Sequence, residues 1–210
     1  MALVFCEVFA GTGLLALWET TESADDLARE FRGSPADVAE AEGIAHPQKR
    51  LEFLASRVLV RTLVENAGFG FQGLEKDVFG KPRLIRHDGY LSLTHTARYA
   101  AAVLHPTRAV GIDLEPITDQ LQRVVPRVLS PAEITHAAAD PQRLAVYWTA
   151  KEAMYKLYGR RGLSFRDHLF IEPFADGVDS VVGRLDFEGL NRRFSIEVRQ
   201  VDGQVLAVGV

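Results

Sequence analysis

The segment that most constrains the fold of this chain is a short run with strand-like alternation, Gly111–Glu115, followed later by the helical run Trp148–Lys156. In an extended segment alternate side chains share a face, so Asp113 and Glu115 point one way and the apolar residues between them point the other. Two neighbouring acids repel each other, and aspartate is disfavoured in strands. The strand therefore indicates either a site for a hard divalent cation with oxygen ligands or, taken alone, two acids facing solvent.

The helix predicted over residues 142–158 has one narrow polar strip. At about 100° per residue, Glu152 and Lys156 share that strip, while Lys151 falls inside the apolar arc. An ammonium in an apolar arc is costly unless it reaches an anion. The plain alternative is an i,i+4 surface pair, with Lys151 extending to water. Taken together, strand and helix would supply three carboxylates and two lysines, a combination that fits a metal–diphosphate site.

Composition limits the class of protein. A chain of 210 residues with 47% hydrophobic and 25% charged residues is ordinary for a globular protein of one large or two small domains. The net charge of −4 gives no basic surface for nucleic acid or an anionic membrane, and no stretch approaches membrane-spanning length. The single cysteine, Cys6, fits a reducing compartment, and no basic leader precedes it, so we expect a cytoplasmic protein.

Hydrophobic periodicity and turn residues predict an α+β chain with a boundary at Pro106, giving halves 1–106 and 107–210. Three strands in the middle of the chain are expected to form one sheet. The predicted helices are 24–31, 48–66, one from Ser130, and 141–159. The predicted strands are 2–10, 13–18, a short pair around 78–82, 90–94, 99–105, 109–115, 169–172, 181–187, 194–201 and 205–210.

The two motifs closely resemble the signature of the Sfp-like 4′-phosphopantetheinyl transferases, a Gly-x-Asp-x-Glu strand followed by a Trp-x-x-Lys-Glu-x-x-x-Lys helix. Gly111–Glu115 and Trp148–Lys156 match it without a gap. Upstream, Phe79–Pro82 resembles the family's Gly-Lys-Pro element, and Leu91–His95 resembles its Ser-His strand end, with Thr94 where serine is usual. The resemblance covers roughly residues 46–165, and the four elements stand in the family's order.

The resemblance implies transfer of the phosphopantetheine arm of coenzyme A to a serine of an apo acyl or peptidyl carrier protein, releasing adenosine 3′,5′-bisphosphate. By position, Asp113, Glu115 and Glu152 would hold Mg²⁺ against the pyrophosphate. The implied catalytic residues are Glu152, Lys156 and Asp113, with Glu152, or a water that it orients, as the base. The residues expected to contact the coenzyme are Arg50, Arg57, Lys81, Thr94, His95, Lys151 and Lys156.

The resemblance also implies a pseudodimer of two similar α+β halves, with coenzyme A in the cleft between them and no need to dimerise further. The first half would contribute coenzyme contacts, and the second would hold the metal site and dock the carrier. An acidic helical carrier suits arginines at the start of the second half, unless the apolar residues there belong to the core. This docking segment contains Arg123, Val124, Val125, Arg127, Val128 and Leu129. A non-catalytic coenzyme A or nucleotide-binding module and a metal-dependent diphosphate hydrolase remain as alternatives.

Overall fold

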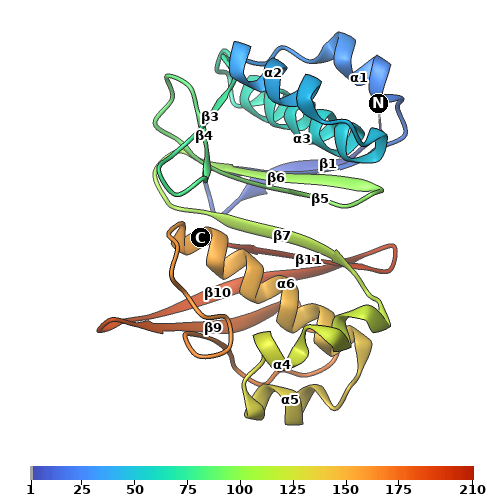
Figure 1. Cartoon of the computed structure of the whole chain (residues 1–210). Helices are drawn as coiled ribbons and strands as arrows, with labels where there is room; N and C mark the ends of the chain where they lie inside the picture. Colours follow the sequence, from blue (N-terminus) through green and yellow to red (C-terminus); the bar gives the residue numbers. More distant parts are fainter. Residues whose placement is uncertain (1) are drawn as a thin grey trace. The chain divides into compact units, whose positions relative to one another are not determined.

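The computed structural model describes residues 2–210, and the chain divides into two compact units, 1–110 and 111–210. Each unit combines an antiparallel sheet with helices that cover one of its faces (Figure 1), so the predicted α+β class is confirmed. The division follows Val110, whereas the sequence placed it at Pro106. Within the described chain, no helix is both long enough and apolar enough to cross a membrane.

The N-terminal unit is built on a four-stranded sheet in the order β1-β2-β6-β5. Strands β3 and β4 form a separate, small two-stranded sheet in the same unit. The elements of this unit are β1 (Ala2–Phe9), β2 (Gly13–Glu19), α1 (Ala24–Glu30), α2 (Pro35–Gly43), α3 (Pro47–Asn66), β3 (Leu74–Lys76), β4 (Pro82–Leu84), β5 (Tyr90–His95) and β6 (Tyr99–His105).

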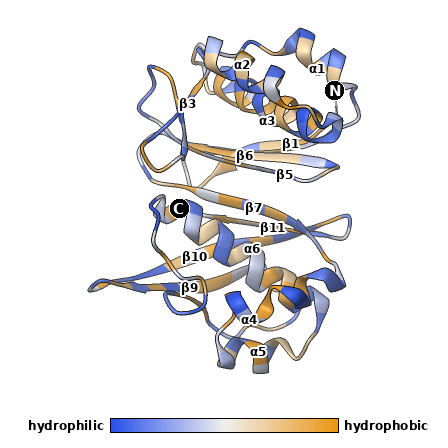
Figure 2. Ribbon diagram, in the orientation of Figure 1, coloured by the Kyte–Doolittle hydropathy of each residue, from blue (hydrophilic) through white to orange (hydrophobic). Residues whose placement is uncertain are grey.

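Helix α3 covers one face of this sheet, and hydrophobic residues alternate with hydrophilic ones along it (Figure 2). Its apolar side chains, among them Leu54, Val58 and Leu59, are almost fully buried and pack with Trp18 and Leu91 of the sheet. Pro47 at the first turn suits a helix start, because proline has no N–H to leave unpaired there. The predicted helix over residues 48–66 is therefore confirmed.

Capping boxes begin α1 and α2. Ser23 and Asp26 cap α1, and Ser34 and Asp37 cap α2, each pair exchanging side-chain and backbone hydrogen bonds. The sequence analysis predicted α1 but not α2. The signal was present as a serine followed by proline and, three residues on, by an acid. Asp37 also accepts a hydrogen bond from the backbone N–H of Leu74 at 2.8 Å, which ties α2 to β3.

The C-terminal unit is built on a five-stranded antiparallel sheet in the order β7-β11-β10-β9-β8. Its long helix, α6, packs on β7 and β11, and it ends at Gly159, whose positive φ of 69° closes the last turn. The elements of this unit are β7 (Gly111–Pro116), η1 (Asp119–Arg123), α4 (Val125–Val128), α5 (Pro131–Ala137), α6 (Pro141–Tyr158), β8 (Leu169–Ile171), β9 (Ser180–Phe187), β10 (Leu190–Val201) and β11 (Gln204–Gly209).

Two strand predictions were wrong. The expected three-stranded sheet does not form, because β5 and β6 pair within the N-terminal sheet whereas β7 pairs with β11 of the other unit. The run Val78–Lys81 is a turn, and the short strands β3 and β4 lie on either side of it. Asp77 stabilises this turn by accepting hydrogen bonds from the backbone N–H groups of Phe79 and Lys81, at 2.8 and 2.9 Å.

Candidate active site

Asp113, in the middle of β7, is paired with Lys156, in the last turns of α6. The Lys156 ammonium donates to Asp113 Oδ1 at 2.7 Å and to the carbonyl oxygen of Ile112 at 3.0 Å. The side chain of Asp113 is 6% exposed and that of Lys156 is 28% exposed. Water screens a pair this buried only weakly, so the two charges hold strand and helix in register.

Glu115 lies on the same face of β7, as the alternation predicted. The Trp148 indole donates a hydrogen bond to its carboxylate, and the same ring stacks on Phe165 at 5.9 Å between centroids. Burial raises the pKa of Glu115, and the charge of Asp113 raises it further, while the Trp148 hydrogen bond and the charge of Lys156 oppose this. The tryptophan of the helix motif thus orients one of the motif's acids, a role that the sequence analysis did not assign.

Glu152 projects from α6 one turn before Lys156 and is half-buried. Burial raises the pKa of Glu152 to about 7, the charges of Asp113 and Glu115 add to this, and Lys156 opposes it. The three carboxylates therefore interact with one another and with a single ammonium. A group whose pKa lies near neutrality can exchange a proton at physiological pH.

Gly111 sets the distance between β7 and α6. A Cβ atom at this position would lie 2.0 Å from the carbonyl oxygen of Ala153 and 2.5 Å from the backbone nitrogen of Leu157. Only a residue without a side chain lets the strand approach the helix backbone this closely. Gly111 faces α6 like Asp113 and Glu115, so the glycine of the motif positions the acids that follow it.

Lys151 does not join this cluster, which corrects its prediction as a coenzyme ligand. Its side chain has no exposed surface, and its ammonium donates to Glu133 Oε2 at 2.7 Å and to the carbonyl oxygens of Val128 and Phe165 at 2.9 and 3.0 Å. Burial lowers the pKa of Lys151, and the carboxylate of Glu133 opposes that shift. The sequence required an anion for this lysine, and the structure supplies Glu133, in the first turn of α5.

In the N-terminal unit, His95 and Lys49 both contact Glu52. His95 Nδ1 and Lys49 Nζ lie 3.3 and 3.1 Å from Glu52 Oε2, and Gln48 Nε2 donates to Glu52 Oε1 at 3.3 Å. The Glu52 side chain is 6% exposed. The sequence analysis missed this acid, although its spacing of three and four residues from Lys49 and Gln48 places all three on one face of α3.

The two arginines predicted to contact the coenzyme differ in their surroundings. Arg57 is 8% exposed, its Nε lies 3.7 Å from Asp37 Oδ1, and its guanidinium lies 4.0 Å from the centre of the Phe53 ring. Burial lowers the pKa of Arg57, and Asp37 opposes that shift. Arg57 therefore ties α3 to α2, and the prediction that it meets a phosphate has no support. Arg50 is half-buried in the first turn of α3, closer to the Glu52 cluster along the helix.

Lys81 and Thr94 complete the predicted set. Thr94 is 7% exposed and neighbours His95 at the end of β5. Lys81 is half-buried and donates to the carbonyl oxygen of Val110 at 3.1 Å. Burial lowers the pKa of Lys81 to about 8, against a partly compensating attraction from Asp77. An anion beside this ammonium would favour its charged form.

The donor set of the C-terminal cluster suits Mg²⁺, which prefers carboxylate oxygens. Repulsion among Asp113, Glu115 and Glu152 would also be relieved by a divalent cation. Within residues 2–210, however, no group of three or more histidine, cysteine, aspartate or glutamate side chains is arranged so that it could hold a metal ion. Asp113 is instead engaged by Lys156. The chemistry of the residues fits the metal, and Lys156 contacts one oxygen of Asp113 in this arrangement.

Residues 109–208 match the family model of the 4′-phosphopantetheinyl transferase superfamily. The matched region begins just before β7 and includes all of α6, so it contains the whole carboxylate cluster. The C-terminal half of this chain is therefore similar to the 4′-phosphopantetheinyl transferase superfamily. The family resemblance inferred from the motifs is thereby confirmed.

A curated protein similar to this chain is the 4′-phosphopantetheinyl transferase HetI of Nostoc sp. (strain PCC 7120). The two sequences are 30% identical over 144 residues, which make up 60% of this chain and 59% of HetI. The alignment thus spans less than two thirds of the relative's length.

The predicted carrier-docking segment of this chain is only partly exposed. Val128 and Leu129 are 7% and 1% exposed and pack in the core of the C-terminal unit, so their proposed contact with a partner was wrong. Val124 and Val125 are half-buried. Arg123 and Arg127 are exposed, so the charged part of the predicted surface is present.

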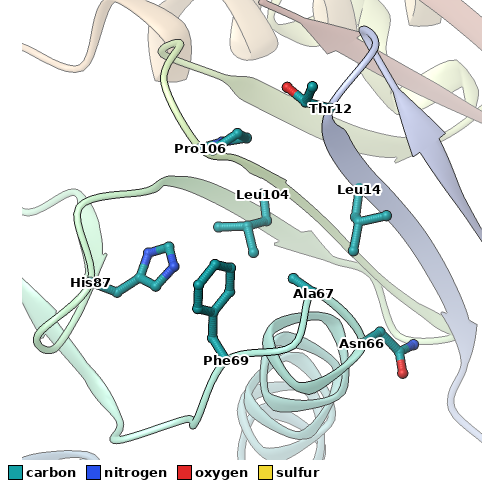
Figure 3. Close-up of a pocket in the computed structure, with 8 residues that line it drawn as sticks. All are labelled: Thr12, Leu14, Asn66, Ala67, Phe69, His87, Leu104 and Pro106. Atoms are coloured by element: carbon teal, nitrogen blue, oxygen red, sulfur yellow. The ribbon is translucent and has the colours of Figure 1, made fainter.

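The N-terminal unit also contains an open cavity of about 340 Å³ near the C-terminal end of α3 (Figure 3). The rings of Phe69 and His87 form one wall, edge to face at 4.4 Å between centroids, and Leu14 and Leu104 line it as well. The Glu52 cluster lies at the opposite, N-terminal end of the same helix. None of the predicted coenzyme or metal ligands lines this cavity.

Proposed function

We propose that this protein transfers the 4′-phosphopantetheine arm of coenzyme A to a serine of an apo acyl or peptidyl carrier protein, with Mg²⁺ and with release of adenosine 3′,5′-bisphosphate. The observation that carries the proposal is the cluster of Asp113, Glu115, Glu152 and Lys156 between β7 and α6. Phosphoryl transfer depends mainly on positioning and charge neutralisation, and this cluster offers groups for both. The superfamily match over the same segment supports it.

Asp113, Glu115 and Glu152 would hold the Mg²⁺ ion. When bound, the metal would neutralise charge on the diphosphate of coenzyme A and on the departing bisphosphate. Trp148 orients the Glu115 carboxylate through its indole hydrogen bond. Gly111 keeps the acids of β7 close to those of α6. Both residues therefore act by positioning and need not touch the substrate.

Glu152 is the proposed base for the carrier's serine. Burial and the neighbouring acids raise its pKa to about 7, so this carboxylate can take up a proton at neutral pH, and a bound Mg²⁺ would lower that pKa. Lys156, one turn further along the same helix face, would donate to a phosphate oxygen of the coenzyme. The nucleophile comes from the carrier, so the enzyme needs no reactive serine or cysteine of its own.

His95, Thr94, Lys81 and Arg50 are the proposed coenzyme ligands of the N-terminal unit. His95 and Lys49 both contact Glu52, so an imidazole and an ammonium lie beside the same carboxylate near the start of α3. This proposal assigns the coenzyme to a cleft between the two halves of a monomeric pseudodimer, as in the family that the motifs resemble. We also propose a cytoplasmic location, consistent with the unpaired thiol of Cys6.

The decisive experiment is incubation of the protein with coenzyme A, Mg²⁺ and an apo carrier, read by intact mass of the carrier. Transfer should add one phosphopantetheine group to it. Asp113→Asn should abolish the reaction, because it removes one of the proposed metal ligands. Asp186→Asn is the matched control, since Asp186 lies 50% exposed on β9 in a pair with Arg184 and has no part in the cluster.

The same experiment separates the alternatives. Consumption of coenzyme A with no change in carrier mass would indicate a diphosphate hydrolase. A protein that binds coenzyme A but does not consume it, when tested with several apo acyl and apo peptidyl carrier proteins, would be a binding module. Either result would refute the proposed transfer.

A further inference from the structure

The ammonium of Lys156 contacts Asp113, one of the acids proposed to bind the metal ion. It donates to Asp113 Oδ1 at 2.7 Å and to the carbonyl oxygen of Ile112 at 3.0 Å, both on β7. The carboxylate is 6% exposed, so this pair has little competition from water. A proposed metal ligand is therefore already neutralised by a cation that belongs to the chain.

The other two acids are held differently. The Trp148 indole orients Glu115, and the charge of Lys156 opposes the effects of burial and of Asp113 on Glu152. In the part of the chain that the structure describes, the acids do not form a ready metal-binding group. One ammonium thus serves three carboxylates that interact with one another.

We propose that Lys156 is a stand-in cation, which neutralises Asp113 until Mg²⁺ and coenzyme A arrive and then moves its ammonium to a phosphate oxygen of the coenzyme. This inference rests on the proposed function. The exchange makes and breaks no covalent bond: Mg²⁺ replaces the ammonium at Asp113, and a phosphate replaces Asp113 at the ammonium. Lys156 is 28% exposed, and its flexible four-carbon stem can swing the charge while the helix stays in place.

The exchange has a thermodynamic consequence. Mg²⁺ alone must displace Lys156 and leave the ammonium without its carboxylate, whereas coenzyme A supplies it with a new anionic partner. Each ligand therefore lowers the cost of binding the other, and this coupling is reciprocal. Without the lysine, the affinity for Mg²⁺ in the absence of coenzyme should be higher, and adding the coenzyme should increase that affinity less.

The test is calorimetric titration of the full chain with Mg²⁺, in the absence and in the presence of coenzyme A. Lys156→Met should bind Mg²⁺ about tenfold more tightly than the wild type without coenzyme, the order expected for removing one competing charge-assisted contact. The gain in Mg²⁺ affinity on adding coenzyme should shrink in this variant. Arg184→Met removes one positive charge from the exposed surface of β9 and should match the wild type in both titrations.

A second readout is thermal unfolding in EDTA and in Mg²⁺. Lys156→Met should unfold at a lower temperature than the wild type in EDTA, because its acids lose their counter-ion, and Mg²⁺ should restore more of its stability. Lys156→Gln provides the same comparison with a polar side chain. Unchanged or weaker Mg²⁺ affinity in both variants would overturn the stand-in role while leaving transfer by the wild type intact. No Mg²⁺ binding by the wild type even with coenzyme, and no transfer, would refute the proposed function as well.

Discussion

Replacement of Gly111 by alanine should loosen the contact between β7 and α6. The added Cβ would lie 2.0 Å from the Ala153 carbonyl oxygen, whereas ordinary contact begins near 3.4 Å, so strand and helix must separate by about 1.4 Å. Both nearest atoms, this oxygen and the Leu157 nitrogen, are backbone and cannot rotate away. Overpacking of this kind costs about 1–3 kcal/mol, and we expect the upper end of that range.

The displacement would also reach the candidate active site. Asp113 follows Gly111 on the same face of β7, and its 2.7 Å hydrogen bond to Lys156 spans the same gap. A misplacement of about 1 Å can reduce catalysis roughly a hundredfold. Gly111→Ala should therefore lose most of the proposed transfer activity even at temperatures where it remains folded.

Urea denaturation and the carrier-modification assay measure the two effects separately. Gly43→Ala is the control, because nothing lies within 4 Å of a Cβ at this last residue of α2, and its stability should change by less than about 1 kcal/mol. Gly183→Ala should fall between the two, since the nearest atom is the sulfur of Met154, at the end of a flexible side chain. Wild-type stability and activity in Gly111→Ala would show that β7 does not depend on this close approach.

Three further outcomes are expected. Lys151→Met should destabilise the protein by about 3–5 kcal/mol in urea, because Glu133 would be left buried and charged without its partner; a loss under 1 kcal/mol would contradict the buried pair. Because the pKa of Glu152 is raised to about 7, fewer of these carboxylates are ionised below that pH, so Mg²⁺ affinity measured with coenzyme should rise between about pH 6 and 8 with proton release. An affinity independent of pH would remove Glu152 from the metal site. Arg127→Glu should raise the KM for an acidic carrier several-fold and leave the KM for coenzyme A unchanged; the reverse pattern would place carrier docking elsewhere.

The local part of the candidate site could be predicted because strands and helices have fixed periods. Alternation along β7 placed Asp113 and Glu115 on one face, and the Trp148 and Lys156 contacts confirm this face. The helical period placed Glu152 and Lys156 on one strip and Lys151 apart from them. These inferences depend only on residues that are close together in sequence.

The parts that could not be predicted depend on residues far apart in sequence. Nothing in β7 indicates that it pairs with β11 at the other end of the chain instead of its sequence neighbour β6. The sequence around Glu133 does not indicate its contact with Lys151, because an acid three residues after Ser130 is already explained as part of a helix cap. The burial of Arg57 similarly depends on Asp37, in a helix that the sequence analysis missed.

The two lysines of the helix motif have different tasks because of their spacing. Five residues along a helix turn a side chain by about 140°, so Lys151 and Lys156 cannot face the same partner. Lys151 points into the core, where Glu133 and two carbonyl oxygens hold it, and this fixes the rotation of α6. Gly111 fixes the depth at which the same helix lies on β7. With rotation and depth both set, Glu152 and Lys156 are held toward the acids of β7, and the ammonium of Lys156, which is 28% exposed, is the charge that we propose changes its partner.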